Sequence, residues 1–205
     1  MKKLGVLLFL AVAMTLLLGG NALAQGDNSV YFVTYYSNAN TSSAPDGVLR
    51  IINDGSASTS QNEGVPNGNM WASIYVFDDS QELQECCNCF VSADGLLSES
   101  VDKNLTANEL TGRAEMSRGV IKVISSTNPD PTNNKLHAGL RGWQTHIQSY
   151  ANQPTSGPYY VTETPLADSN LVSAEQSALQ QSCSFAITLG SGFGICSCTQ
   201  EDHDF

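Results

Sequence analysis

Short apolar runs rich in β-branched and aromatic residues recur along the chain, separated by polar stretches of Asn, Asp, Gly, Pro and Ser. Each run has the length of a strand rather than a helix, and the polar stretches carry the residues that turns require. This pattern predicts an all-β fold, most simply an antiparallel sandwich-like domain. The clearest predicted strands are Val30–Tyr36, Val48–Ile52, Ser73–Phe77, Val120–Ile124, Tyr159–Thr164 and Phe185–Leu189.

One segment fits both the helical spacing of apolar residues and the alternation of a strand. Residues 136–148 place apolar side chains at helical spacing, but Gly139 and Gly142 would each cost a helix about 1 kcal/mol. Trp143 and Ile147 also alternate with polar neighbours, so we expect a half-buried strand.

A second segment, residues 168–181, has the composition of a helix. Ser173 as N-cap and Gln176 three residues later would form a capping box. We therefore expect about one short helix near the C-terminus. No repeat and no shift in composition marks a boundary inside the chain, so the sequence predicts one domain over residues 25–205.

The first 24 residues have the order of an export signal. Two lysines precede the apolar stretch Leu4–Leu18, and the small residues Ala22 and Ala24 stand before Gln25. The stretch is short for a bilayer span, for which about 20 residues are needed, so an uncleaved anchor is the less favoured alternative. The sequence predicts a cleaved signal peptide over residues 1–24 and a secreted mature chain without a membrane span, periplasmic or extracellular.

The acidic net charge limits the classes of partner that the chain can bind. The formal net charge is −11, and loss of the two signal lysines would bring it to −13. Such an acidic chain is repelled by nucleic acid and by anionic membranes, so we expect neither as a partner. Hydrophobic residues make up 41% and charged residues 14%, which is the composition of a folded chain.

Six cysteines form the main candidate site: Cys86, Cys87, Cys89, Cys183, Cys196 and Cys198. In an exported protein an even number normally forms disulfides, here with 15 conceivable pairings. Adjacent Cα atoms lie about 3.8 Å apart, too close for a bond between Cys86 and Cys87. In an extended chain Cys87 and Cys89 share one face and Cys86 points the other way.

The two late cysteines of the CSC sequence would likewise share a face. Two such segments side by side allow bonds between the clusters and leave Cys183 for the remaining cysteine. A bond between the clusters closes a loop of roughly 100 residues and stabilises by about 4.7 kcal/mol in the chain-entropy model. We expect the C-terminus to be fixed to the middle of the fold, with the individual pairing left open.

A metal or redox site is the alternative use of these cysteines. Zinc sites commonly space their cysteines two to four residues apart, whereas here the spacing is one, and no CxxC is present. The histidines His137, His146 and His203 complete no ligand pattern. Disulfides are the preferred interpretation, with no metal and no cofactor.

Weaker candidates surround the cysteines. Asp78, Asp79, Glu82 and Glu85, with the acidic end of the chain at 201–205, could supply oxygens for calcium. The twelve-residue calcium loop is absent, so we prefer turn-capping acids on a solvated surface. Residues 190–194, with alternating glycines, read as a hairpin turn between two strands rather than as a nucleotide site.

Two further function classes stay open. His137 or His146 could act as a general base in a secreted hydrolase. Aromatic residues could form the platform of a carbohydrate-binding module, although we expect both tryptophans to be in the core. The aromatic candidates are Trp71, Trp143, Tyr35, Tyr36, Tyr159 and Tyr160.

The stretch from Tyr75 to Cys89, YVFDDSQELQECCNC, together with the late CSC, resembles a group of uncharacterised exported bacterial proteins. The likeness spans most of the mature chain and implies no activity and no catalytic residues. We therefore expect a secreted structural or adhesive domain without catalysis. Self-association or a cell-surface glycan would be its partner, and Val30–Tyr36 is either an internal strand or one exchanged with a neighbour.

Overall fold

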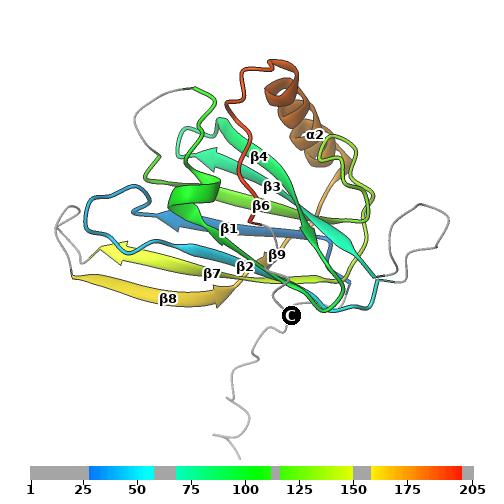
Figure 1. Cartoon of the computed structure of the whole chain (residues 1–205), viewed down its shortest axis with the longest axis horizontal. Coiled ribbons are helices and arrows are strands. Elements are labelled where there is room, and N and C mark those ends of the chain that lie inside the picture. The colour runs from blue at the N-terminus through cyan, green and yellow to red at the C-terminus, as the bar shows by residue number, and fades with distance from the viewer. Residues whose placement is uncertain (1–27, 58–67, 112–115, 150–157, 200–205) are drawn as a thin grey trace, which may run out of the picture.

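The computed structural model describes residues 28–57, 68–111, 116–149 and 158–199. In these residues two antiparallel sheets face each other, and one helix packs on the outside (Figure 1). The prediction of an all-β sandwich-like fold with a short helix near the C-terminus is confirmed.

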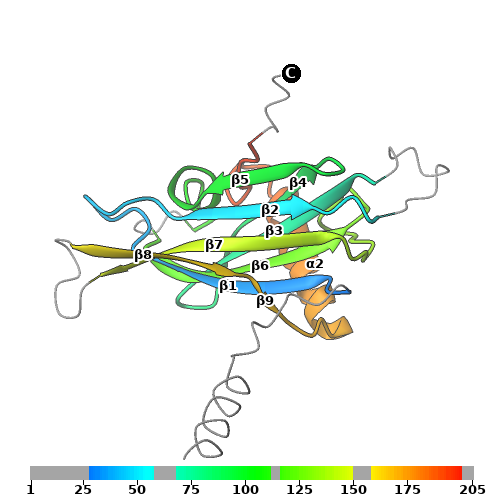
Figure 2. The same cartoon turned by 90° about the horizontal axis from the view of Figure 1, so that it is seen from below.

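The first sheet has the strand order β4-β3-β6-β1-β9 and the second β5-β2-β7-β8 (Figure 2). A short π-helix, η2 (Val101–Leu105), follows β5. The elements in chain order are β1 (Tyr31–Ser37), β2 (Val48–Asn53), β3 (Met70–Asp78), β4 (Leu83–Val91), β5 (Leu96–Ser100), β6 (Arg118–Ser126), β7 (Leu140–Ser149), β8 (Tyr159–Pro165), β9 (Ala167–Asp168) and α2 (Ser173–Thr188).

The first strand is internal to its own sheet. β1 is antiparallel to β6 from Tyr31 opposite Ile124 to Ser37 opposite Arg118, and it contacts β9 on its other edge. Phe32 points between the sheets and is 1% exposed, while Tyr31 lies under the helix. Apolar side chains on both faces are therefore explained by two covered faces within one chain.

The main core lies between the sheets. Alternate residues of each strand point inward, because successive side chains of a strand face opposite sides. The five-stranded sheet contributes Ile74 and Val123, among others, and the four-stranded sheet contributes Leu49, Ile51 and Leu97. All five are at most 1% exposed.

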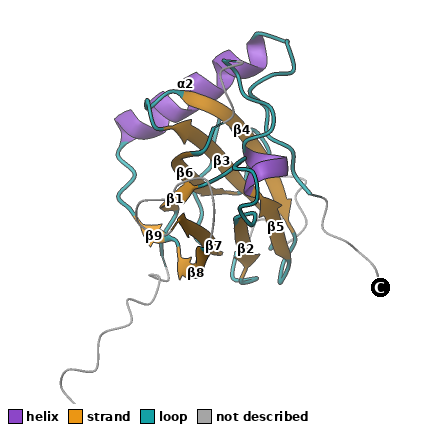
Figure 3. Cartoon of the chain, turned by 90° about the vertical axis from the view of Figure 1, so that its left-hand side faces the viewer, coloured by secondary structure: helices purple, strands orange, loops and turns teal. Residues whose placement is uncertain are grey.

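A second, smaller core lies between the five-stranded sheet and α2, which covers the side of that sheet away from β2 and β5 (Figure 3). The helix buries Leu179, Cys183 and Ala186, a stripe at the i, i+4, i+7 spacing of one helical face. These side chains pack near Tyr75 of β3, whose hydroxyl donates to the carbonyl of Pro131 at 2.8 Å.

Three sequence predictions near the C-terminus are wrong. Phe185–Leu189, expected as a strand, belongs to the end of α2 and its C-cap, because burial of Cys183 and Ala186 continues the helical stripe. The N-cap is Val172 without a side-chain hydrogen bond, so Ser173 forms no capping box. Residues 190–194 follow a helix instead of joining two strands. Gly190 ends the helix in the left-handed region, with φ 62°.

The ambiguous segment 136–148 does form a strand from Leu140 onward, β7 (Leu140–Ser149), but the buried face carries Gln144 and His146 while Trp143 lies on the other face. Gly142 faces the core opposite Ile51, and an added Cβ there would collide with the side chain of Leu166. Among the described residues, no helix has both the length and the apolar character to cross a membrane.

Candidate functional site

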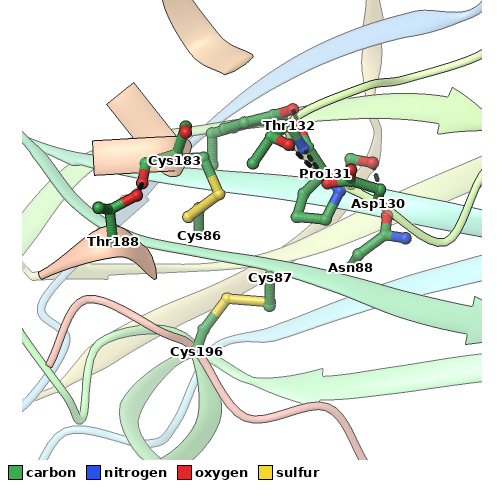
Figure 4. Close-up of a disulfide and its surroundings, with 12 residues drawn as sticks. Cys86, Cys87, Asn88, Asp130, Pro131, Thr132, Cys183, Thr188 and Cys196 are labelled. Carbon is green, nitrogen blue, oxygen red and sulfur yellow. Dashed lines mark hydrogen bonds between the residues drawn. A yellow bond between two sulfur atoms is a disulfide. The ribbon is translucent and has the colours of Figure 1, made fainter. Parts of the chain in front are cut away.

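The six cysteines form three disulfides, and β4 distributes them between its two faces. Figure 4 shows two of them, Cys86–Cys183 and Cys87–Cys196, on opposite faces of β4. Cys86 bonds Cys183, Cys87 bonds Cys196, and Cys89 bonds Cys198. The first bond lies in the core under α2, and the other two lie in the core between the sheets. This follows from strand geometry, because residue 86 faces away from residues 87 and 89.

The Cys86–Cys183 bond fixes the helix to the sheet. Both residues are 0% exposed, and their Cα atoms are 5.8 Å apart, within the usual range for a disulfide. Leu179 and Ala186 pack around the bond from the same helical face. The helix is thus held by a covalent bond at the centre of its apolar stripe.

The other two bonds fix the segment 194–199 along the free edge of β4. Both span 109 residues of sequence, so the segment runs parallel to β4 in constant register. The amide of Cys86 donates to the carbonyl of Gly194 at 2.9 Å, and the amide of Cys196 donates back to the carbonyl of Cys86 at 3.2 Å. The expected attachment of the C-terminal cysteines to the middle of the fold is observed, with a short parallel bridge instead of a full strand.

Three of these sulfurs form a group whose geometry resembles a metal site. The Sγ atoms of Cys87, Cys89 and Cys198 lie within 4.8 Å of one another, the only such group of ligating side chains among the described residues. Zinc binds thiolates, whereas each of these sulfurs is bonded to another sulfur. In this oxidised state the group stabilises the fold and offers no thiolate.

Two buried glutamates hold the loops and the C-terminal segment around the cysteines. Glu99 of β5 accepts hydrogen bonds from the amide and hydroxyl of Thr199, at 2.8 and 2.9 Å. Glu85 of β4 accepts from the amide of Asn108 at 2.7 Å. The side chain of Asn108 in turn donates to the carbonyl of Ile195 at 3.2 Å. Each carboxylate therefore supports the segment that the disulfides fix.

Burial raises the pKa of the carboxyl groups of Glu85 and Glu99. Desolvation raises the pKa of Glu85 to about 7, partly opposed by the hydrogen bond from Asn108. Desolvation also raises the pKa of Glu99, against hydrogen bonds from Thr199. In both residues the second oxygen, Oε2, is buried without a hydrogen-bond partner. The sequence did not predict that these two glutamates are buried, because its pattern placed Glu85 on a solvated surface and did not single out Glu99.

The acidic residues proposed for calcium do not form one site. Asp78 caps a turn, with Oδ1 accepting from the amides of Ser80 and Glu82 at 2.9 Å each. Asp79 forms an ion pair with Arg118 at 2.7 Å, and Glu85 points into the protein. The structure thus supports turn capping for Asp78 and corrects the surface placement of Glu85. Residues 201–205 and His203 lie outside the described residues.

Of the two described histidines, His146 lies in β7 and His137 precedes that strand. His146 of β7 is 3% exposed, shares a 2.8 Å hydrogen bond between Nε2 and the Thr164 hydroxyl, and stacks on Tyr35 with ring centroids 4.1 Å apart. Burial lowers the pKa of His146. Its Nδ1 is buried without a partner, so no carboxylate orients the ring as a triad requires. Nδ1 of His137 lies 2.6 Å from the carbonyl of Ala138.

The tryptophans lie on the outer faces of different sheets, and the prediction that they are core residues is wrong. Trp71 of β3 alternates with inward-facing Ala72 and contacts Phe90 edge to face, with ring centroids 5.4 Å apart. Trp143 of β7 is paired with Arg50 on the outside of the other sheet. Both are half-buried, and they cannot form one sugar platform because the sandwich separates them.

The remaining four aromatic candidates lie at different places in the fold. Tyr36 is buried, and its hydroxyl donates to the carbonyl of Phe77 at 3.2 Å. The exposed Tyr35 accepts a hydrogen bond from Gln148 at 3.0 Å. Tyr159 and Tyr160 begin β8 at the edge of the four-stranded sheet. The six aromatics therefore do not form a single surface.

No family model, no curated protein and no solved structure matches this chain. The resemblance to uncharacterised exported proteins stays a prediction.

Proposed function

We propose that the protein is exported and serves outside the cytoplasm as a disulfide-locked structural or adhesive module. The observation that carries this proposal is the set of three disulfides, which includes every described cysteine. Such bonds form and persist in oxidising compartments such as the periplasm or the extracellular space. The order of residues 1–24 supports the same interpretation, with cleavage before Gln25.

The titratable side chains support a structural role over catalysis. Glu85 and Glu99 are engaged with the backbone of Asn108 and Thr199 inside the fold. His146 is stacked and bonded to a neighbouring threonine. A general acid or base must reach the proton it transfers, and these groups face protein rather than an open surface.

Expression of the full chain in a host with a periplasm tests the export step. The exported form should begin at Gln25 on N-terminal sequencing, and its intact mass should lie about six hydrogens below that of the reduced chain. Replacing both Ala22 and Ala24 by leucine should block cleavage and leave the signal attached. A chain that stays in the cytoplasm with free thiols would contradict the proposal.

Binding to isolated cell envelopes tests the structural or adhesive step. The purified mature chain should sediment with envelopes and should not turn over chromogenic ester, glycoside or peptide substrates. Matched Trp71→Ala and Trp143→Ala variants test the two outer faces separately, because the two rings lie on different sheets. Hydrolysis that disappears in a folded His146→Ala variant would instead establish a hydrolase.

A further inference from the structure

The last strand of the four-stranded sheet is an exposed edge. β8 contacts β7 on one side and is the terminal strand on the other. Nearly all of its residues are exposed, with Val161 at 56%. Its sequence, YYVTETP, is rich in the aromatic and β-branched residues that favour strands.

The hydrogen-bond register defines which backbone groups point outward. The amide of Leu166 donates to the carbonyl of Gly142 at 2.9 Å, two residues beyond the pair of Thr164 and Gln144. Antiparallel partners alternate between hydrogen-bonded and non-hydrogen-bonded pairs. Residues 160, 162 and 164 therefore bond to β7, while the amides and carbonyls of Tyr159, Val161 and Glu163 point away from the sheet.

The other edge strands are shorter than β8 or are bonded by the C-terminal segment. The segment 194–199 bonds to the edge of β4, and the Thr199 hydroxyl lies 3.0 Å from the carbonyl of Ser98 on β5, a strand of five residues. β9 has only two residues. β8, with seven residues, is thus the longest edge strand for which the described part of the chain supplies no covering segment.

We propose that β8 pairs with β8 of a second copy of this chain, antiparallel and about a two-fold axis at Val161. In this register Val161 faces its own counterpart, and Tyr159 faces Glu163 of the other copy. All three outward positions then form hydrogen-bonded pairs, giving about six bonds across the axis. Pro165, which has no amide to donate, falls just outside this ladder. The two four-stranded sheets become one continuous sheet.

The side chains fit the same register. Across the axis Val161 meets valine, and Tyr160 meets Thr162, which are favourable cross-strand combinations. Glu163 is the strand's single charged residue, and its carboxylate is neutralised by Arg50 of β2 at 2.7 Å. Lysines and inward-pointing charges, which commonly prevent edge pairing, are missing from this strand.

Sedimentation of the purified mature chain, compared with the variant Val161→Pro, tests the pairing. Proline removes an outward amide and no bond to β7, so the monomer should keep its circular dichroism spectrum. The wild type should dimerise, more tightly at higher salt because both copies are acidic. The variant loses two bonds of the ladder and should raise the dimer dissociation constant about 30-fold or more.

Val161→Thr is the matched control, because it keeps the amide and the branched shape and should still dimerise. Hydrogen exchange adds a measurement that needs no variant. The amides of residues 159, 161 and 163 should exchange more slowly as protein concentration rises, while those of 160, 162 and 164 should be protected throughout. A wild type that stays monomeric up to about 100 μM would overturn the proposal, as would a dimer that Val161→Pro leaves unchanged.

Discussion

Replacing Glu85 by glutamine removes an ionisable group that the fold keeps away from water. Burial raises the pKa of this carboxyl from 4.5 to about 7. Below pH 4.5 both the folded and unfolded chains hold the proton. Between the two pKa values the unfolded chain releases it while the folded chain keeps it, so the free energy of unfolding falls as pH rises and levels off above about 7.

The size of this effect follows from the shift. Each unit of pKa corresponds to about 1.4 kcal/mol, so the full change is about 3 kcal/mol, of which about 2.5 kcal/mol falls between pH 5 and 8. Glutamine retains an oxygen that can accept the 2.7 Å hydrogen bond from the amide of Asn108. Its amide also cannot ionise. The variant should therefore gain about 2.5 kcal/mol relative to the wild type over that pH range.

Urea unfolding at pH 5, 6, 7 and 8 measures this directly, because the difference between variant and wild type cancels contributions from other groups, including Glu99. Glu82→Gln is the matched control, since it makes the same chemical change at an exposed position of the adjacent turn. A difference between Glu85→Gln and wild type that stays constant within about 0.5 kcal/mol from pH 5 to 8 would refute the reasoning. The reasoning would also be refuted if Glu82→Gln changed the free energy of unfolding with the same pH dependence as Glu85→Gln.

Two further predictions concern the covalent and steric framework. Removing the Cys86–Cys183 bond by paired serine substitutions opens a loop spanning 97 residues and should lower the free energy of unfolding by about 4 to 5 kcal/mol, measured by urea unfolding without reductant. A loss below about 1 kcal/mol would show that packing alone holds α2 on the sheet. Gly119→Ala would place a methyl group against the carbonyl of Phe77 and the ring of Tyr36, so the variant should fail to fold or melt well below wild type. A melting temperature equal to that of the wild type would contradict the close approach of β6 and β3 at this point.

The local pattern of residues determined most of the strands and the way the cysteines divide. Alternation along β4 places Cys86 opposite to Cys87 and Cys89, because successive side chains of any strand face opposite sides. This much needs no tertiary information. The individual pairing stayed open at that stage, because only the fold brings Cys183 of α2 over Cys86 and places Cys196 and Cys198 beside β4.

Tertiary packing determined the structure of the segments in which local propensity and burial favour different outcomes. Phe185–Leu189 has strand-like composition, yet its backbone continues a helix because Cys183 and Ala186 are buried against the sheet at helical spacing. Glu85 belongs to a run of surface-type acids, and only the strand register places its carboxylate in the interior, where desolvation raises its pKa. Which edge remains exposed also depends on the whole fold. The sequence predicts that Tyr159–Thr164 is a strand, but only the strand order and the path of residues 194–199 along β4 show that β8 is the longest edge strand without a covering segment.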